Sequence, residues 1–520
     1  MEDFLQTETL IIELMLVVVL VALVVRRLRI PYTVALVVTG LALTVNKSLH
    51  FEMTPNLIMA LFVPPLVFQA AFHINFSDLR RDLPGVLLLA VPGVMLTTVI
   101  VGGFVAVAAP LRLPLALVFG ALIAATDPVA VVAVFRTLGV PKRLGVLVEG
   151  ESLLNDGTAI VLFRLVLASA LAGQVDALGG VADFIWVSAG GTLIGLALGW
   201  IVARLIARVD DYLIETTLTT VLAFGSYLIA ERLGVSGVLA VVAAGLVNGE
   251  LGPAGMSPTT RIVLFNFWEY VAFVANSLVF LLIGLRIDIW ALVAVWQPII
   301  GAVVAVLLAR AVVVYGVGFV ANRFGEPVPL RWQHVMAWSG LRGAVSLALA
   351  LSLPVALGTE RDLLLVMAFG VVLFTLLAQG TTVELLLRWL HVVTERSRAV
   401  VDFEAPHARL AALRTGDSHL RRLHAEGLLS DYTWKPLQAD LARREGELTD
   451  EVHELLRSHP ELASEERAMA RQELLRAQRG ALLARRREGL ISDEVFEDLI
   501  HEVDEALAGD SEGEPSVRHA

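Results

Sequence analysis

The chain has 520 residues, of which 57% are hydrophobic and 18% charged, and its mean hydropathy is +0.74. These values exclude a soluble globular fold of this length and favour a membrane protein. Cysteine is absent, which excludes disulfides, thiol chemistry and zinc fingers. The formal net charge is −11, but the acidic excess lies from Val393 onward, so it says nothing about the substrate and gives no reason to expect nucleic acid.

Runs of roughly 20 apolar residues, the length of a helix that crosses a bilayer, recur from Leu10 to about Leu390. We therefore predict an all-α polytopic membrane protein with about 13 transmembrane helices. The predicted spans are 8–25, 31–46, 56–73, 84–109, 114–135, 143–171, 181–207, 212–232, 235–249, 262–285, 289–320, 332–357 and 361–391. The N-terminus lacks a basic segment, so we expect no cleavable signal peptide.

Lysine and arginine are concentrated in alternate connections between these spans. One set of connections includes Arg26, Arg27, Arg29 and Arg136, whereas the opposite set is sparse and includes Lys47. Basic connections face the cytoplasm. This asymmetry predicts an N-terminus outside the cell membrane and a cytoplasmic C-terminal tail.

The fifth span contains Thr126, Asp127 and Pro128 within an apolar run. Aspartate followed by proline is a helix start signal, here in the middle of a span. We therefore expect a helix that is broken in the bilayer and restarts at Pro128. Facing ends of broken helices form ion sites in secondary transporters; the alternative is a kink without an ion contact.

The sixth span carries a polar stretch that includes Glu151, Ser152, Asn155 and Asp156. On a helix, Glu151 shares a face with Asn155, and Ser152 with Asp156. Carboxylates inside a membrane are costly and mark functional sites, and oxygen ligands suit hard cations. The alternative is a polar cluster that only holds helices together.

The twelfth span contains Gly340-Leu341-Arg342-Gly343. Glycines on both sides of an intramembrane arginine indicate a second interrupted helix. The fifth and twelfth spans are an odd interval apart and run in opposite directions. We therefore predict an inverted repeat with two broken crossing helices.

Two further polar residues lie within spans. Gln69 follows Pro64-Pro65, which we expect to break or kink the third span at mid-membrane. Gln69 is either interhelical glue or an auxiliary site residue. Asn276 lies in the tenth span, where it is placed to orient Asp127 or Asp156.

The tail has a charged, helical pattern, so we divide the chain into a transmembrane domain, 1–392, and a soluble helical cytoplasmic domain, 393–520. Glu426-Gly427-Leu428-Leu429-Ser430-Asp431 recurs as Glu488-Gly489-Leu490-Ile491-Ser492-Asp493. In each copy glycine is expected to end one helix and serine to cap the next. We expect this domain to be regulatory.

Four segments together resemble bacterial sodium/proton antiporters of the monovalent cation:proton antiporter-1 family, relatives of the eukaryotic sodium/proton exchangers. The segments are 126–131, 150–156, 236–240 and 340–344, and the tail contains none of them. The resemblance implies a homodimer of chains with thirteen helices, each with a dimerisation domain and a mobile core domain, and no cofactor.

The resemblance also assigns roles to individual residues. It implies that Asp156, with Asn155 beside it, binds either Na⁺ or H⁺, and that Ser152 contributes a ligand. It places Thr126 and Asp127 at the unwound crossing. It implies an ion pair between Glu151 and Arg342. Many relatives have an acid in the third span where this chain has Gln69.

We therefore expect a secondary active transporter, not an enzyme, that exchanges Na⁺, Li⁺ or K⁺ for H⁺ by alternating access at Asp156. With Asn155 in place of a second acid, we expect the exchange to be electroneutral. One rival is an intramembrane aspartyl protease that uses Asp127 and Asp156. Another is a cation channel, which needs no titrating acid at a single site.

Overall fold

The computed structural model describes residues 2–25, 32–46, 59–173, 177–209, 211–256, 258–286, 288–321, 327–393, 395–487, 490–492 and 495–503. By their internal contacts, the residues form two compact units, Met1–Val392 and Val393–Ala520. The basic residues Arg26, Arg27, Arg29 and Lys47, which contributed to the predicted orientation, lie outside the described residues.

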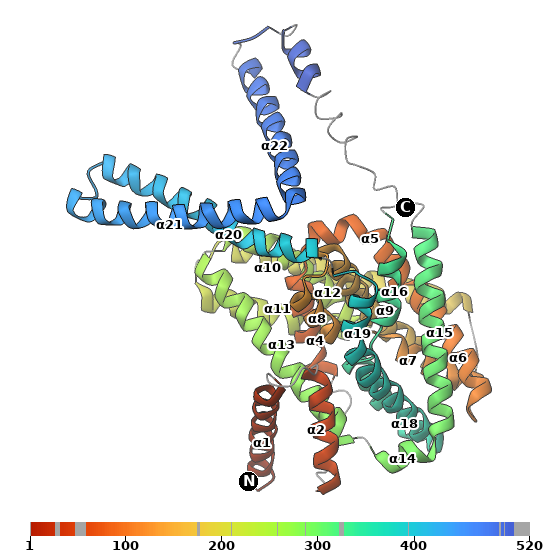
Figure 1. Cartoon of the computed structure of the whole chain (residues 1–520). Helices are drawn as coiled ribbons and strands as arrows, with labels where there is room; N and C mark the ends of the chain where they lie inside the picture. The colour runs from red at the N-terminus through yellow and green to blue at the C-terminus, as the bar shows by residue number, and fades with distance from the viewer. Residues whose placement is uncertain are drawn as a thin grey trace. The chain divides into compact units, whose positions relative to one another are not determined.

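The first unit is all-helical in its described residues (Figure 1). Its α-helices are α1 (Glu2–Val25), α2 (Tyr32–Asn46), α4 (Val63–His73), α5 (Phe76–Ala90), α6 (Pro92–Ala108), α7 (Leu113–Ala124), α8 (Val129–Leu138), α9 (Lys142–Ala172), α10 (Ala177–Ile206), α11 (Tyr212–Arg232), α12 (Gly237–Gly255), α13 (Pro258–Arg286), α14 (Ile289–Ala294), α15 (Trp296–Ala321), α16 (Leu330–Trp338), α17 (Ala344–Leu351), α18 (Thr359–Phe374) and α19 (Gly380–Trp389). A 3₁₀ turn, η1 (Val355–Leu357), precedes α18, and a π turn, η2 (Thr375–Gln379), joins α18 to α19.

Within the described residues, 8 helical segments are long and apolar enough to cross a membrane, and four shorter apolar helices accompany them. The shorter ones are Ile12–Val25, Tyr32–Leu43, Met59–His73 and Gly237–Gly252. The predicted all-α polytopic membrane fold is therefore confirmed. The count of about 13 crossings stays a prediction.

The two predicted breaks are present. Helix α7 ends at Ala124 and α8 begins at Val129, while α16 ends at Trp338 and α17 begins at Ala344. The fifth span thus restarts one residue later than predicted. A further break at Val295 separates α14 from α15, within a span that was predicted to be continuous.

A break accompanies the prolines of the third span, as predicted. A turn at Phe62 interrupts the helical residues of 59–73, and Pro64 and Pro65 occupy the first turn of α4, which follows that turn. Proline is tolerated at that position because the first amides of a helix have no intrahelical acceptor.

The helices of the first unit pack as two groups. Helices α10, α11 and α12 contact one another, α12 packs on α4, and α13 packs on α2 and α4; we call these the scaffold group. Helices α5, α6, α7, α9 and α15 contact one another, and α16 to α19 join them; we call these the core group. Figure 1 shows α11 and α13 of the scaffold group on one side and α15 and α6 of the core group on the other.

Small residues allow α10 and α12 of the scaffold group to approach closely. A Cβ atom added to Gly195 would lie 2.1 Å from the carbonyl oxygen of Ala240, and one added to Gly191 would lie 2.3 Å from that of Ser236. In a bilayer, such close backbone packing replaces the hydrophobic driving force for association.

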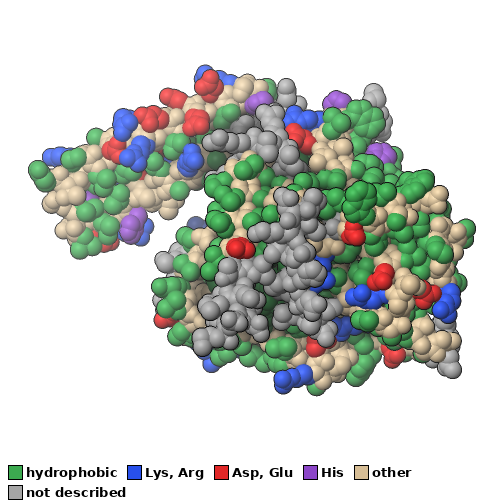
Figure 2. All heavy atoms as spheres, turned by 90° about the horizontal axis from the view of Figure 1, so that it is seen from below, with side chains coloured by type: hydrophobic (Ala, Val, Ile, Leu, Met, Phe, Trp, Pro, Cys, Tyr) green, Lys and Arg blue, Asp and Glu red, His purple; other side chains and the backbone are tan. Residues whose placement is uncertain are grey.

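The outer surface of this unit is apolar. Figure 2 shows hydrophobic side chains over much of one face, with charged side chains scattered among them. On α10 the exposed residues include Ile185 (60%), Trp186 (70%) and Leu193 (65%). A surface of this kind faces lipid or another protein surface.

The second unit contains three long helices, α20 (Glu395–Ala425), α21 (Asp431–Ser458) and α22 (Pro460–Arg487). Gly427 follows α20 with a φ of 74°, as predicted for the first copy of the repeat. Ser430 occupies the predicted N-cap position of α21, but its side chain makes no capping hydrogen bond to the described residues. The hydrogen bond with His424 lowers the pKa of Asp431. Glu488, Gly489 and Asp493 of the second copy lie outside the described residues.

The packing of α10 on α12 predicts different effects for two glycines of the same helix. Gly195→Ala places a methyl group against the backbone of Ala240 and should destabilise the unit by about 1–3 kcal/mol. Gly180→Ala is the matched control, because a Cβ atom there meets nothing within 4 Å. Thermal unfolding of the purified variants measures the difference, and equal melting temperatures would contradict the packing.

Candidate cation-binding site

The two broken segments meet at their breaks. The backbone amide of Asp127 donates a hydrogen bond to the carbonyl oxygen of Leu341 at 2.8 Å. A break leaves carbonyl groups without partners at the end of one helix and amide groups without partners at the start of the next. Inside a membrane these groups need partners from the protein.

Charged side chains supply those partners. The Nη1 atom of Arg342 donates to the carbonyl oxygens of Ala124 (2.8 Å) and Ala125 (3.1 Å), which end α7. The carboxylate of Asp127 accepts from the amide of Val129 (3.0 Å) and bonds the backbone of Ala344, so it caps α8 and α17 together. Each charge therefore lies at the helix end whose dipole favours it.

Helix α9 holds the unwound residues from another side. The Nδ2 atom of Asn155 donates to the carbonyl oxygen of Ala124 (3.1 Å) and to the hydroxyl of Thr126 (3.1 Å). The hydroxyl of Ser152 donates to the carbonyl oxygen of Thr126. Ser152 and Asn155 are each 3% exposed, so these bonds are shielded from water.

Asp156 lies next to these tethers, on the wall of a cavity of about 450 Å³. Its Oδ1 atom is buried and has no hydrogen-bond partner among the described residues. Thr126, Asp127 and Ser152 line the same cavity. The structure thus brings together the carboxylate, hydroxyl and backbone oxygens that suit a hard monovalent cation.

The predicted auxiliary residues also line this cavity. Gln69 comes from α4 and Asn276 from α13, so both belong to the scaffold group. The sequence position of Asn276 suggested that it orients Asp127 or Asp156. Among the described residues, however, no hydrogen bond joins Asn276 to either of these aspartates. Gln69 presents a neutral amide to the cavity.

The cavity reaches the surface near Arg136 and Glu149. The side chains of these residues are 72% and 31% exposed, and they form an ion pair of 3.5 Å. Glu149 precedes Asp156 by two turns of α9, on the same face. His73 and Glu269 line the cavity as well. The sequence interpretation did not assign any of these four residues to the cation site, although all of them are polar residues within or next to apolar spans.

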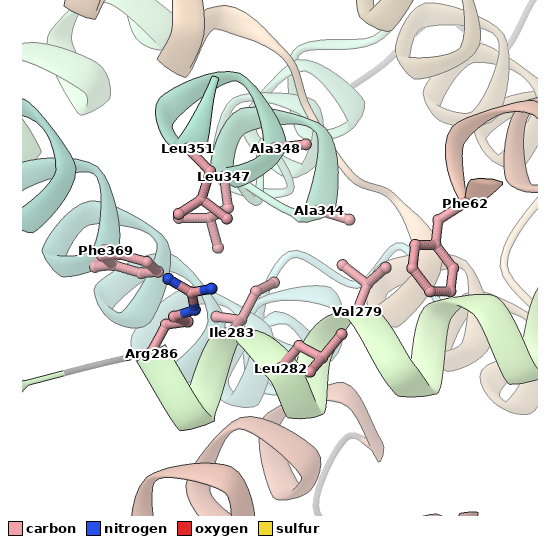
Figure 3. Close-up of a pocket in the computed structure, with 10 residues that line it drawn as sticks. All are labelled: Phe62, Val279, Leu282, Ile283, Arg286, Ala344, Leu347, Ala348, Leu351 and Phe369. Carbon is pink, nitrogen blue, oxygen red and sulfur yellow. The ribbon is translucent and has the colours of Figure 1, made fainter. Parts of the chain in front are cut away.

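A small apolar pocket lies on the other side of the crossing. Figure 3 shows Val279 and Ile283 of α13 facing Ala344 and Leu347 of α17 across it, with Arg286 at one end. Its volume is about 30 Å³. Ala344 lines both this pocket and the large cavity, so the crossing separates them.

The predicted ion pair between Glu151 and Arg342 is wrong in its arginine. Glu151 pairs with Arg310 of α15, whose Nη2 atom lies 2.9 Å from Oε2 and whose Nη1 atom contacts Oε1. The reason is that Arg342 donates to the carbonyl groups that end α7. The Nε and Nη2 atoms of Arg310 also donate to the carbonyl oxygen of Met336.

A signal for Arg310 was present in the sequence. It is the only charged residue between Trp296 and Ala321, and an intramembrane arginine needs a partner. The structure buries it to 7% exposure.

Comparison with known proteins identifies the family. A family model described as sodium/hydrogen exchanger, transmembrane, matches residues 14–389. The chain belongs to this family. The resemblance noted in the four sequence segments is therefore confirmed, and the family is one of transporters, not enzymes.

Two relatives of this exchanger-family chain span most of its length. The Na(+)/H(+) antiporter ApNhaP of Aphanothece halophytica is 39% identical over 449 residues, which cover 85% of this chain and 86% of the relative. The Na(+)/H(+) antiporter NhaG of Bacillus atrophaeus is 36% identical over 490 residues, or 91% of this chain and 92% of the relative. Because 91% of the chain exceeds the first unit, similarity extends into the tail, which the four segments did not indicate.

The fold matches a solved member. The sodium proton antiporter MjNhaP1 from Methanocaldococcus jannaschii has a TM-score of 0.63 and 21% identity, and the match covers 75% of this chain and 99% of that one. The architecture of the first unit is therefore that of this antiporter.

The corrected ion pair predicts which arginine is coupled to Glu151. Removing Arg310 leaves a buried carboxylate without its partner and should destabilise the protein by about 3–5 kcal/mol. A double-mutant cycle of Arg310→Met with Glu151→Gln should give a large coupling energy in thermal or denaturant unfolding. The matched cycle of Arg342→Met with Glu151→Gln should give a smaller one, and the reverse order would contradict the assignment.

Proposed function

We propose that this chain exchanges a monovalent cation for H⁺ at Asp156, by alternating access across a membrane. The supporting observation is the buried Oδ1 atom of Asp156, which has no hydrogen-bond partner among the described residues and lies on the wall of the large cavity. A carboxylate held away from water requires a neutralising partner. A cation and a proton both meet that need and exclude one another.

The preferred cation is Na⁺, with Li⁺ and K⁺ as alternatives. The names of the relatives state Na⁺ and H⁺, and the oxygens of Thr126, Ser152 and Asp156 suit any of the three ions. Asp127 caps two helices and Glu151 is paired with Arg310, so Asp156 is the one of these three carboxylates that has no such structural partner among the described residues. One carboxylate that carries either one cation or one proton gives an electroneutral exchange.

The two rival functions are weaker. A protease needs two carboxylates that share a proton and activate water, but the Asp127 carboxylate accepts hydrogen bonds from helix N-termini. A channel needs a path that is open on both sides, whereas the pocket that shares Ala344 with the cavity is apolar and has a volume of about 30 Å³ among the described residues.

The assembly and orientation follow as parts of the same proposal. We place the protein in the cell membrane with its N-terminus outside and its tail in the cytoplasm, as a homodimer. The exposed apolar face of α10 supports the dimer, because a scaffold that stays fixed needs a surface to hold it. The tail is proposed to be regulatory.

Everted membrane vesicles with an imposed pH gradient test the function. Addition of Na⁺, Li⁺ or K⁺ in turn should collapse the gradient reported by a pH-sensitive dye, with and without a potential clamp. A response to Na⁺ or Li⁺ that is indifferent to the clamp supports electroneutral exchange. A response to K⁺ alone keeps the site and changes the substrate, and no response to any cation contradicts the proposal.

Asp156→Asn should abolish the exchange in these vesicles, because an amide neither binds a proton in this pH range nor neutralises a cation. The exchange rate should fall to the background rate of vesicles that lack the transporter. Asp183→Asn is the control, since Asp183 lies on the exposed face of α10. Exchange that persists in a folded Asp156→Asn protein would remove Asp156 from the mechanism.

Alternating access also predicts a role for an ion pair between the two helix groups. Arg164 of α9 in the core group donates to both carboxylate oxygens of Glu231 of α11, at 3.0 and 2.9 Å. Arg164 follows Asp156 by about 12 Å along α9, on the side away from Glu149. Opening that side separates the groups, so it must break this pair.

Neutralising Arg164 or Glu231 should therefore favour the state that opens on that side. The chain has no cysteine, so Ala348→Cys in the apolar pocket provides a unique reporter. Arg164→Gln or Glu231→Gln should increase its labelling by a membrane-impermeant thiol reagent about 1.4- to 5-fold, since partly exposed pairs contribute about 0.2–1 kcal/mol. The reversed pair, Arg164→Glu with Glu231→Arg, should restore the original labelling, and labelling that no variant changes would contradict this role.

A further inference from the structure

Thr375 is a buried residue whose position is set by an irregularity in its helix. It is 1% exposed and begins the π turn η2, between α18 and α19. π turns are rare, and they occur frequently at functional sites because they reorient the side chains around them. The segment around Thr375 otherwise has an apolar, helical sequence, so the sequence interpretation did not single it out.

The hydroxyl of Thr375 joins this π turn to the break between α16 and α17. Its Oγ1 atom donates to the carbonyl oxygen of Val372 at 3.0 Å and accepts from the backbone amide of Arg342 at 3.1 Å. Because the hydroxyl hydrogen is directed at Val372, a lone pair of the oxygen faces Arg342. Both bonds are buried.

A second hydroxyl from the same segment holds the other side of the break. The indole nitrogen of Trp338, the last residue of α16, donates to the Oγ1 atom of Thr382 at 3.0 Å. The segment from α18 to α19 therefore contacts the side chain of Trp338 before the break and the backbone of Arg342 within it.

The bond to Thr375 continues into the cation site. The backbone amide of Arg342 donates this bond, and its guanidinium donates to the carbonyl oxygen of Ala124. Asn155, the neighbour of Asp156, donates to that same carbonyl oxygen. A displacement of the Arg342 backbone is thus transmitted through Ala124 to the residue beside the titrating carboxylate.

We propose that Thr375 is a positioning residue for the cation site. It touches neither cation nor proton, and it acts by fixing the Arg342 backbone so that the guanidinium and Asn155 meet at Ala124. This inference rests on the proposed exchange at Asp156. Without the hydroxyl, the amide of Arg342 is a buried donor without an acceptor, which the protein relieves by moving the interrupted segment.

Thr375→Val tests the proposal, because valine keeps the shape of threonine and removes only the hydroxyl. In everted vesicles we expect the apparent KM for the cation to rise about tenfold, the scale of one buried hydrogen bond. The maximal rate per folded transporter should change much less. Thr375→Ser keeps the hydroxyl and should restore a KM close to that of the unmodified protein.

Thr381→Val is the matched control. Thr381 is a neighbouring threonine of α19 whose exposed hydroxyl donates to the carbonyl oxygen of Leu377 in the preceding turn η2. Its loss should leave KM unchanged. The amount of folded transporter, measured by detergent size-exclusion chromatography, separates a site effect from a folding defect.

Three outcomes count against the inference in distinguishable ways. An unchanged KM in Thr375→Val, with normal exchange by the unmodified protein, overturns the role of Thr375 alone. A lower maximal rate that follows the amount of folded protein, with KM unchanged, assigns Thr375 to stability only. No exchange by the unmodified protein overturns the proposed function, and the inference with it.

Discussion

The constraint on which the structure depends is that interrupted backbone in a membrane must find its hydrogen-bond partners within the protein. The two segments that break at the crossing each supply what the other lacks. Arg342, from the second break, holds the carbonyl groups that end α7, and Asp127, from the first break, holds the amide groups that begin α8 and α17. The crossing is therefore one mutually dependent unit, and the cation site forms around its edge.

This arrangement explains why Asp156 differs from the other buried carboxylates around the crossing. Asp127 is engaged by helix amide groups, and Glu151 by the guanidinium of Arg310. Both are fixed because a buried charge without a partner is strongly destabilising. Asp156 differs, since one of its oxygens is buried without a hydrogen-bond partner in the described structure. The protein thus provides partners for the structural carboxylates of Asp127 and Glu151, whereas the carboxylate proposed to carry the cation or proton keeps one oxygen without a partner within the described part of the chain.

The sequence predicted those features that have a local cause. Asp127-Pro128 is a helix start within an apolar run, and Gly340 and Gly343 flank an intramembrane arginine, so both breaks were correctly predicted. The partner of Glu151 was wrong because two arginines compete for it, and the choice depends on where α15 packs. Thr375 was missed for a similar reason, since a π turn and its contact with Arg342 arise from tertiary packing. Local chemistry shows that a group needs a partner, whereas the fold decides which partner it receives.

Charge balance connects this geometry to the kind of exchange. Gln69 brings a neutral amide to the cavity, and Asn155 brings another beside Asp156. The guanidinium of Arg342 is hydrogen-bonded to the carbonyl groups that end α7, so its charge stabilises the crossing. When Asp156 binds Na⁺ or H⁺, the loaded site carries the same net charge in either case. The two half-reactions then move equal charge through the membrane, so the potential cancels over a complete cycle, and the driving force reduces to the two concentration gradients.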